Sequence, residues 1–495
     1  MEGNNKMKKV VKIGFAPTKR VPFNHPQYME VRDKIFEAIK GWTCDGIIEV
    51  VDIADVTPLN ILQTEDDVEA VVKKFHDAKV DGVFFPHCNF GCEAAVAGVA
   101  RQLKVPVLLW GPRDDSTEDN GGSEFGVGVG RPRDSQCGLF ASGKALRRVN
   151  VPFTYIPNTD IDDPTFKRGY EAFAAVCAAV RDFKETQILQ VGTRPEPFWT
   201  VMINEGEILE KFGIRVLPVS NFELSERAKA LIENEPERVK KACEMIGNTT
   251  KYVKAEDCEV ASLGVDDHQI MMLGAYYEAM LDWSKELKCN AAAMQCWAAF
   301  RGSMGIAACG INGFLADAGL PVACETDIHG VIGTRLLQGA CLYNSGVFFA
   351  DLTVRHRFNE NSELLWHCGN FPPSTAGDDI EKVMWQEGRT HFECRKGEPI
   401  TIIRFDGDHG EYSMLIGEGK GVDGPRTGGT YSWCEVKDWV AWEDKIVKGP
   451  YIHHSCCAYG EYMPIVAEAC MYLGIKADFA DEGAEKACKE FWYGR

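Results

Sequence analysis

Apolar runs alternate with helix-like patterns along the N-terminal part of the chain. Residues 9–16, 46–53, 80–86 and 105–110 are short, mostly apolar runs that predict buried strands. Between them, residues 27–40, 66–78 and 93–103 repeat apolar side chains at helical spacing. This alternation predicts a parallel sheet with helices on both faces.

A second alternating region follows. The pattern predicts strands at 187–192, 214–219, 291–296 and 321–324. It predicts helices at 166–183, 199–212, within 224–245, at 268–287 and at 305–318. This region therefore also has the character of an α/β domain.

The pattern changes after residue 346, where short strands separated by turn residues predominate. We expect strands at 347–354, 363–367, 390–394, 400–406, 412–417 and 430–434, with one clear helix at 462–473. The predicted fold class is α/β: two successive doubly wound parallel-sheet α/β domains followed by a mainly antiparallel β C-terminal domain. The expected domains are 1–170, 171–322 and 323–495, the last carrying metal or catalytic residues.

Composition narrows the classes of function. The chain has 495 residues, is 45% hydrophobic and carries a formal charge of −19, which argues against nucleic acid or an anionic membrane as the main partner. Its 19 cysteines contain no Cys-x-x-Cys, so zinc ribbons are disfavoured and reduced thiols in a cytoplasmic protein are expected. No apolar run is long enough to span a membrane.

Polar residues follow the predicted strands of the first domain, where ligands bind in open parallel sheets. Arg20, His87, Asn89 and Arg113 are candidate substrate-binding residues there. The alternative for the loop at 85–93 is a helix cap, with Glu93 favoured by the helix dipole. The alternative for the arginines is a solvated surface.

Two carboxylates, Glu325 and Asp327, follow the last strand of the second domain. Residues two apart in an extended chain point to the same side, so both can face one site. Such a pair either binds a hard divalent cation or divides the roles of acid and base. The alternative is an N-cap aspartate beside a solvated glutamate.

The β domain contributes the segments Trp366–Asn370 and 451–454. Since neighbours on a strand point to opposite faces, only one of His453 and His454 is expected to face a given site. Trp297 and Trp366 could cover an apolar side of a bound ligand, or pack in the core. The glycine-rich run 417–424 contains a formal GxGxxG but is not followed by a helix, so we interpret it as turns or a mobile loop rather than a dinucleotide site.

The order of these motifs resembles the L-fucose isomerase and L-arabinose isomerase superfamily. The shared features are Ala323-Cys-Glu-Thr-Asp-Ile-His-Gly330, Trp366-His-Cys-Gly-Asn370, the His453-His454 pair and Asn89-Phe-Gly-Cys-Glu93. The resemblance implies an intramolecular oxidoreductase, an aldose–ketose isomerase acting through a cis-enediolate with a divalent metal, usually Mn²⁺.

By the same resemblance, Glu325 and Asp327 are the expected catalytic groups and metal ligands, together with His454 (or His453). A further metal-binding glutamate of the fucose enzymes has no counterpart between Glu286 and Glu325, and Gln295 or His367 is expected to substitute. Gln295 is also a candidate for substrate binding, with Trp297, Trp366 and His453.

The resemblance also implies a homo-oligomer with the active site near a subunit interface, and a small-molecule sugar as partner. If Arg20 and Arg113 face the substrate, an anionic sugar such as sulfoquinovose fits. Two alternatives stay open: an enediolate-based epimerase or lyase on a related sugar, and a non-catalytic sugar-binding protein.

Overall fold

The computed structural model describes residues 9–21, 27–114 and 133–494. The chain divides into two compact units. The N-terminal unit comprises Lys8–Arg181 with Ala467–Gly474 and Lys486–Arg495, and the larger unit comprises Asp182–Val466 with Ile475–Glu485. No helix in the described ranges combines the length and apolar character that a membrane span requires.

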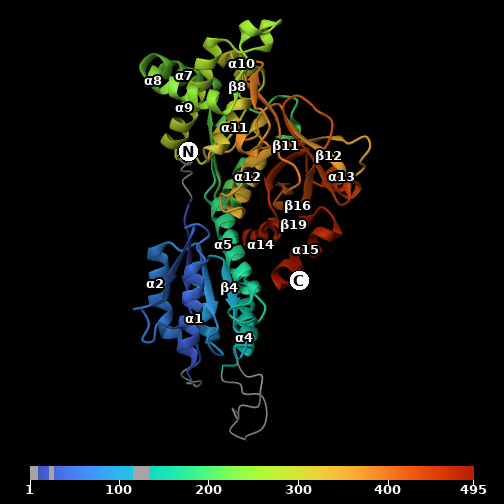
Figure 1. Ribbon diagram of the computed structural model, residues 1–495. Helices are drawn as coiled ribbons and strands as arrows, with labels where there is room; N and C mark the ends of the chain where they lie inside the picture. The colour runs from blue at the N-terminus through green and yellow to red at the C-terminus, as the bar shows by residue number, and fades with distance from the viewer. Residues whose placement is uncertain (1–8, 22–26, 115–132, 495) are drawn as a thin grey trace. The chain divides into compact units, whose positions relative to one another are not determined.

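The N-terminal unit contains a parallel sheet in the order β2-β1-β3-β4-β5 (Figure 1). Its strands are β1 (Val11–Phe15), β2 (Ile48–Asp52), β3 (Gly82–Pro86), β4 (Val107–Trp110) and β5 (Thr154–Tyr155). Its helices are α1 (Gln27–Gly41), α2 (Val68–Ala78), α3 (Glu93–Leu103) and α4 (Ser135–Arg148), and α5 (Pro164–Lys184) continues into the larger unit.

Side-chain alternation along β3 explains why helices cover both faces of this sheet. Phe84 lies 6.0 Å, between ring centroids, from Phe166 of α5. Its neighbours Val83 and Phe85 point the other way and pack in one cluster with Phe75 of α2. The predicted doubly wound arrangement is confirmed for this domain.

The larger unit begins with a second parallel sheet, in the order β10-β9-β6-β7. Its strands are β6 (Gln187–Val191), β7 (Arg215–Val219), β9 (Ala291–Met294) and β10 (Val322–Ala323). The helices of this region are α6 (Glu205–Phe212), α7 (Asn221–Asn234), α8 (Pro236–Thr249), α9 (Asp267–Glu286), α10 (Ala298–Met304), α11 (Cys309–Asp317) and α12 (Ile328–Ala340). Because β9 and β10 are parallel neighbours, the residues that follow them meet at one edge of the sheet.

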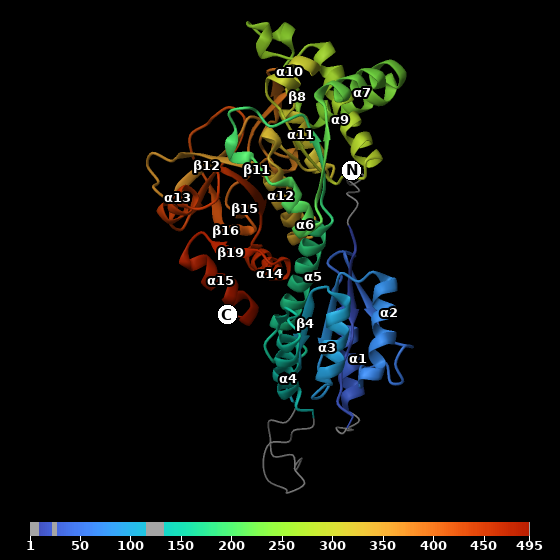
Figure 2. The same cartoon turned by 180° about the vertical axis from the view of Figure 1, so that it is seen from behind.

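Antiparallel strands then close a barrel, in the order β16-β15-β18-β11-β12-β17, with β17 pairing back to β16 (Figure 2). These strands are β11 (Val347–Arg355), β12 (Ser362–His367), β15 (Pro399–Asp408), β16 (Glu411–Val422), β17 (Thr430–Val436) and β18 (His454–Tyr459). Helix α12 is buried on all sides, packing against β9 of the parallel sheet and against β11, β15 and β18 of the barrel. The sheet and the barrel therefore share one core helix.

Flanking elements complete the C-terminal region. They are β8 (Lys251–Tyr252), β13 (Val383–Trp385), β14 (Arg389–Glu393), β19 (Lys476–Phe479), α13 (Trp439–Lys448), α14 (Met463–Leu473) and α15 (Glu482–Tyr493). The predicted β character is confirmed, although the sequence pattern identified only α14 among these helices and missed β13, β18 and β19. The domain boundaries at 170 and 322 stay a prediction.

Two local predictions were wrong. The glycine-rich run is not a loop: Gly417, Gly419 and Gly421 lie within strand β16. A Cβ atom at position 417 would lie 2.1 Å from the ring of Trp442, so the glycine leaves room for this indole in the core. The predicted helix 305–318 begins only at Cys309, after a separate helix α10.

Candidate active site

Residues from both halves of the larger unit line one cavity of about 630 Å³. Six of the residues proposed from the sequence lie around it: Trp297, Glu325, Trp366, His367, His453 and His454. They come from the ends of β9 and β10, from β12, and from the start of β18. The barrel thus supplies the imidazoles and the parallel sheet supplies the glutamate.

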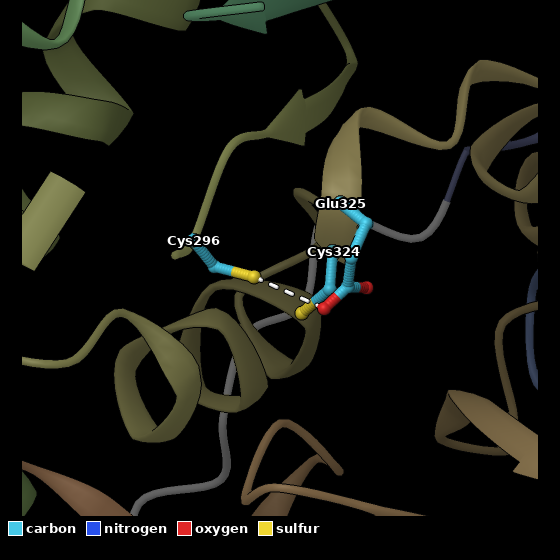
Figure 3. A group of neighbouring side chains, drawn as sticks. All are labelled: Cys296, Cys324 and Glu325. Carbon is cyan, nitrogen blue, oxygen red and sulfur yellow. Dashed lines mark hydrogen bonds between the residues drawn. The ribbon is translucent and has the colours of Figure 1, made fainter. Parts of the chain in front are cut away.

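Glu325 has a left-handed backbone, with φ 52° and ψ 21°. A non-glycine residue in this region is held there at a cost of roughly 1–2 kcal/mol, and such conformations gather at functional sites. Its Oε1 accepts hydrogen bonds from Nε1 of Trp297 (3.0 Å) and from Sγ of Cys296 (3.3 Å). Figure 3 shows the Cys296 thiol directed at this carboxylate.

Asp327 is completely buried and its oxygens are already occupied. Its carboxylate forms an ion pair with Arg404, accepts the backbone N–H of Gly330 at 2.9 Å, and accepts Nδ1–H of His454 at 2.8 Å. It is the N-cap of α12, as the capping alternative predicted. Asp327 is not among the residues that line the cavity, so it acts on the site through His454.

Asp351 is the carboxylate that the sequence analysis missed. It lies directly opposite His454 in the β11–β18 ladder, so both side chains lie on one face. Its Oδ1 is 3.5 Å from Nε2 of His454 and 3.8 Å from Nε2 of His367. A single acid interrupting the apolar run Val347–Leu352 was the signal that could have identified it.

The atoms that face one another here fit a divalent cation. Within the described residues, Glu325 Oε2, Asp351 Oδ1 and His367 Nε2 are buried and have no hydrogen-bond partner. Nε2 of His367 is 3.7 Å from Oε2 of Glu325. Carboxylate oxygens with imidazole nitrogens suit Mn²⁺, Fe²⁺ or Zn²⁺. Ligand atoms of Asp351, His453 and His454 also lie within 4.8 Å of one another.

The hydrogen bonds made by Nδ1 of His367 and of His454 determine which nitrogen of each ring faces the cavity. His454 gives Nδ1 to Asp327, and Nδ1 of His367 accepts the backbone N–H of Cys368 at 2.9 Å. His454 therefore presents the lone pair of Nε2 to Asp351, and a carboxylate behind an imidazole is the usual support for a metal-binding histidine. Neutral His367 instead carries its proton on Nε2, which faces Asp351 as a hydrogen-bond donor.

Charge and burial shift the pKa values of these groups in opposite directions. Burial would raise the pKa of Asp327, but the charges of Arg404 and His454 hold that pKa far below its usual range. Burial favours neutral His454, yet the hydrogen bond and charge of Asp327 leave the pKa of His454 raised. Burial and the neighbouring His454 lower the pKa of His453, so His453 is a neutral hydrogen-bonding group.

Two arginines also line the cavity, Arg301 and Arg389. Arg301 forms an ion pair with Glu387. The Nε of Arg389 is buried and has no hydrogen-bond partner among the described residues. The sequence analysis missed both of these cations.

The predicted residues of the first domain all lie in the N-terminal unit. Arg20 pairs with Glu93 at 3.0 Å, and its backbone N–H donates to Asn89 Oδ1 at 2.8 Å. His87 is fully buried between Ser142 and the carbonyl of Trp110, and burial lowers its pKa to about 4. Arg113 is exposed and donates to the carbonyl of Asn158.

Of the other residues predicted to bind substrate, some line the cavity and one does not. Gln295 follows β9 but does not line the cavity. A further carboxylate was sought before Glu325, whereas the one that lines the cavity, Asp351, lies after it in the chain. Trp297 is 42% exposed at the cavity, and Trp366 donates its Nε1–H to the carbonyl of Gly428. Both residues line the cavity.

Three proteins of similar sequence are each named sulfoquinovose isomerase. The protein from Alkalicoccus urumqiensis is 23% identical over 75% of this chain and 79% of its own. That from Priestia aryabhattai is 23% identical over 83% of this chain and 85% of its own, and that from Clostridium sp. (strain MSTE9) is 25% identical over 68% and 72%.

Among solved structures, an ABC transporter periplasmic solute binding protein from Actinobacillus succinogenes 130z, with bound D-allose, aligns at 12% identity. The match covers 58% of this chain and 78% of that one, and its TM-score of 0.16 is too low to support an argument.

The N-terminal unit gives the family match. Residues 14–184 match the family described as Fucose/sulfoquinovose isomerase, N-terminal domain. This range runs from the end of β1 through the whole of α5. The resemblance seen in the sequence is confirmed: the chain carries a fucose/sulfoquinovose isomerase N-terminal domain and is a distant relative of proteins named sulfoquinovose isomerase.

Proposed function

We propose that this protein is an aldose–ketose isomerase that converts a monosaccharide through a cis-enediolate and uses a divalent cation, Mn²⁺ in the first instance. The observation that carries the proposal is the convergence of Glu325, Asp351, His367 and His454, three of which present a buried atom without a hydrogen-bond partner. Glu325, Asp351 and His454 are the proposed ligands, and His367, predicted from the sequence as a ligand, is proposed instead as a hydrogen-bond donor beside Glu325 and Asp351. When bound, such a cation polarises the sugar carbonyl and stabilises negative charge on oxygen.

Glu325 is the proposed proton carrier. Trp297 and Cys296 hold its Oε1, which leaves Oε2 as the oxygen facing the cavity. This oxygen removes the proton from carbon beside the carbonyl and returns it to the neighbouring carbon. Such general acid–base help contributes roughly 10²–10⁴-fold to the rate. Asp327, predicted from the sequence as a ligand, is proposed instead as a positioning residue for His454.

The cavity favours an anionic sugar. Arg389 and Arg301 line the cavity, and the unpaired Nε of Arg389 is a donor for a sulfonate or similar group. The names of the relatives support a sulfonated hexose such as sulfoquinovose. His453, Trp297 and Trp366 are the proposed contacts for the sugar hydroxyls and its apolar side.

The test is turnover by purified protein. After chelation and reloading with Mn²⁺, the protein is incubated in D₂O with sulfoquinovose and, separately, with neutral aldoses, and followed by NMR. We expect ketose to form, with solvent deuterium at C1 of the ketose and, through the reverse reaction, at C2 of the aldose. An inverted aldose as the product would indicate an epimerase, and substrate binding that neither requires metal nor leads to product would indicate a sugar-binding protein. A cytoplasmic homo-oligomer stays a prediction from the sequence.

A further inference from the structure

Two cysteines face each other across the wall of the cavity. Cys309 is the first residue of α11, and Cys368 directly follows β12. Their sulfurs are 3.1 Å apart, and both residues line the cavity that holds Glu325 and His367. A disulfide has an S–S length of about 2.05 Å, so an approach of about 1 Å would join them.

We propose that Cys309 and Cys368 are an oxidative modification site, at which a small peroxide that enters the cavity converts the two thiols into a disulfide. The pair is 59 residues apart in sequence, and it links α11 to the strand that carries His367. Both residues line the cavity, and Cys368 is partly exposed, so a peroxide that enters the cavity arrives beside the pair.

The reaction balances with hydrogen peroxide as the only co-reactant. The sulfur of Cys309 attacks one peroxide oxygen, the O–O bond breaks, and a sulfenic acid and one water form. The sulfur of Cys368 then attacks the sulfenic sulfur: the S–S bond forms, the S–O bond breaks, and a second water leaves. The two thiols lose two electrons and two protons in total, and the peroxide is reduced to water.

The surroundings favour Cys309 as the attacking thiol. Cys309 is the first residue of α11, where the positive end of the helix dipole favours a thiolate, and the charge of Arg389 acts in the same direction. Since thiolates react with peroxides much faster than thiols, a lowered pKa assists the first step. Cys368 is then already in contact with the sulfur that it must attack.

The bond would act on the metal site through His367. Nδ1 of His367 lies 2.9 Å from the backbone nitrogen and 3.3 Å from the sulfur of Cys368. Disulfide formation draws the Cys368 sulfur toward α11 and away from the His367 ring. It also shifts the backbone N–H of Cys368, which orients that ring. We expect His367 to lose its alignment with Asp351, so that metal affinity falls on oxidation. The effect on catalysis rests on the proposed function, whereas formation of the disulfide does not.

Peptide mapping tests the modification on the full-length protein. The protein is reduced, desalted, treated with a small excess of hydrogen peroxide, alkylated and digested without reductant. We expect one cross-linked peptide pair joining Cys309 to Cys368, lighter by two hydrogens than the two reduced peptides and separated again by dithiothreitol. Cys309 found only as sulfinic or sulfonic acid, or cross-linked to another cysteine, would overturn the proposal.

Variants and metal binding test the consequence. Mn²⁺ affinity is measured before and after peroxide for the wild type, for Cys309→Ser and for the control Cys137→Ser, which removes an exposed thiol of the N-terminal unit. We expect a fall of at least tenfold that dithiothreitol reverses in the wild type and in the control, and no reversible fall in Cys309→Ser. A cross-linked protein with unchanged Mn²⁺ affinity would refute the link to His367. If the reduced protein turns over no sugar, the proposed function fails, while the peptide map still decides the modification.

Discussion

Oδ2 of Asp327 accepts a hydrogen bond of 2.8 Å from Nδ1 of His454, and both side chains are buried. This bond fixes the imidazole proton on Nδ1 and turns Nε2 toward Asp351, 3.5 Å away. Arg404 holds Asp327 from the other side and also pairs with Asp406 at 2.8 Å. One buried guanidinium thus anchors two aspartates, and each of these bonds a histidine, because Asp406 lies 3.2 Å from Nδ1 of His329.

This near symmetry provides a matched pair of substitutions. Asp327→Asn keeps the shape of the side chain but presents either an amide donor or a weaker acceptor to Nδ1 of His454, so the imidazole loses its fixed proton position. We expect Mn²⁺ affinity and kcat/KM to fall about 10- to 100-fold, as is usual for the partner of a metal-binding histidine. Titration calorimetry with Mn²⁺ and initial rates measure the two effects.

Asp406→Asn is the control for the lost charge. It removes the same charge from the same arginine, but His329 is not among the residues that line the cavity. We expect both variants to lose stability and only Asp327→Asn to lose metal affinity. Equal losses of affinity in the two variants would mean that Asp327 acts through the packing around Arg404.

Asp351 is expected to be a ligand itself. Asp351→Asn replaces a charged oxygen by a neutral amide between two imidazoles, so Mn²⁺ affinity should fall at least 100-fold. The thermal midpoint in the presence of chelator should change little, because Oδ1 of Asp351 has no hydrogen-bond partner to lose. Asp408→Asn, at an exposed position 74% accessible at its side chain, is the control for the charge. Unchanged affinity in Asp351→Asn would exclude this residue from the ligand set.

The sequence predicted the fold more completely than it predicted the candidate site. Apolar periodicity located the strands of both parallel sheets, except the two-residue strand β5, because their burial is encoded locally, residue by residue. Asp351 was not predicted as a site residue because its role depends on the register of β11 against β18. That register places it opposite His454, about a hundred residues away in the chain. Glu325 and His454 were found through short motifs. The role of Asp327 could not be found in this way, because Arg404 lies 77 residues further along the chain.

Arg389 should discriminate between charged and neutral sugars. Arg389→Met retains much of the side-chain length but removes the guanidinium that lines the cavity. We expect kcat/KM for a sulfonated hexose to fall at least 10- to 100-fold, since a charge-assisted hydrogen bond contributes about 1.5–3 kcal/mol. Turnover of a neutral aldose should change much less. Arg301→Met, which removes the other cavity arginine, is the comparison. Equal falls in kcat/KM for the sulfonated and the neutral sugar in Arg389→Met would mean that Arg389 does not bind the anionic group.

Glu363 of β12 is expected to make stability depend on pH. It is 4% exposed, its Oε2 has no hydrogen-bond partner among the described residues, and burial together with the charge of Glu443 raises its pKa to about 7 from 4.5. The folded state therefore binds this proton more tightly than the unfolded state. Below pH 4.5 both states are protonated and no penalty exists; it grows as the pH rises from 4.5 to about 7 and is then constant.

Glu363→Gln removes that penalty because the amide stays neutral at every pH. The variant should match the wild type in thermal midpoint near pH 4.5 and exceed it by several degrees at pH 8, where the penalty reaches at most about 3 kcal/mol. Glu435→Gln on the neighbouring strand β17, at an exposed position, changes the same charge and should leave the midpoint nearly constant at both pH values. A Glu363→Gln midpoint that is equally raised at both pH values would show that packing, and not ionisation, governs this position.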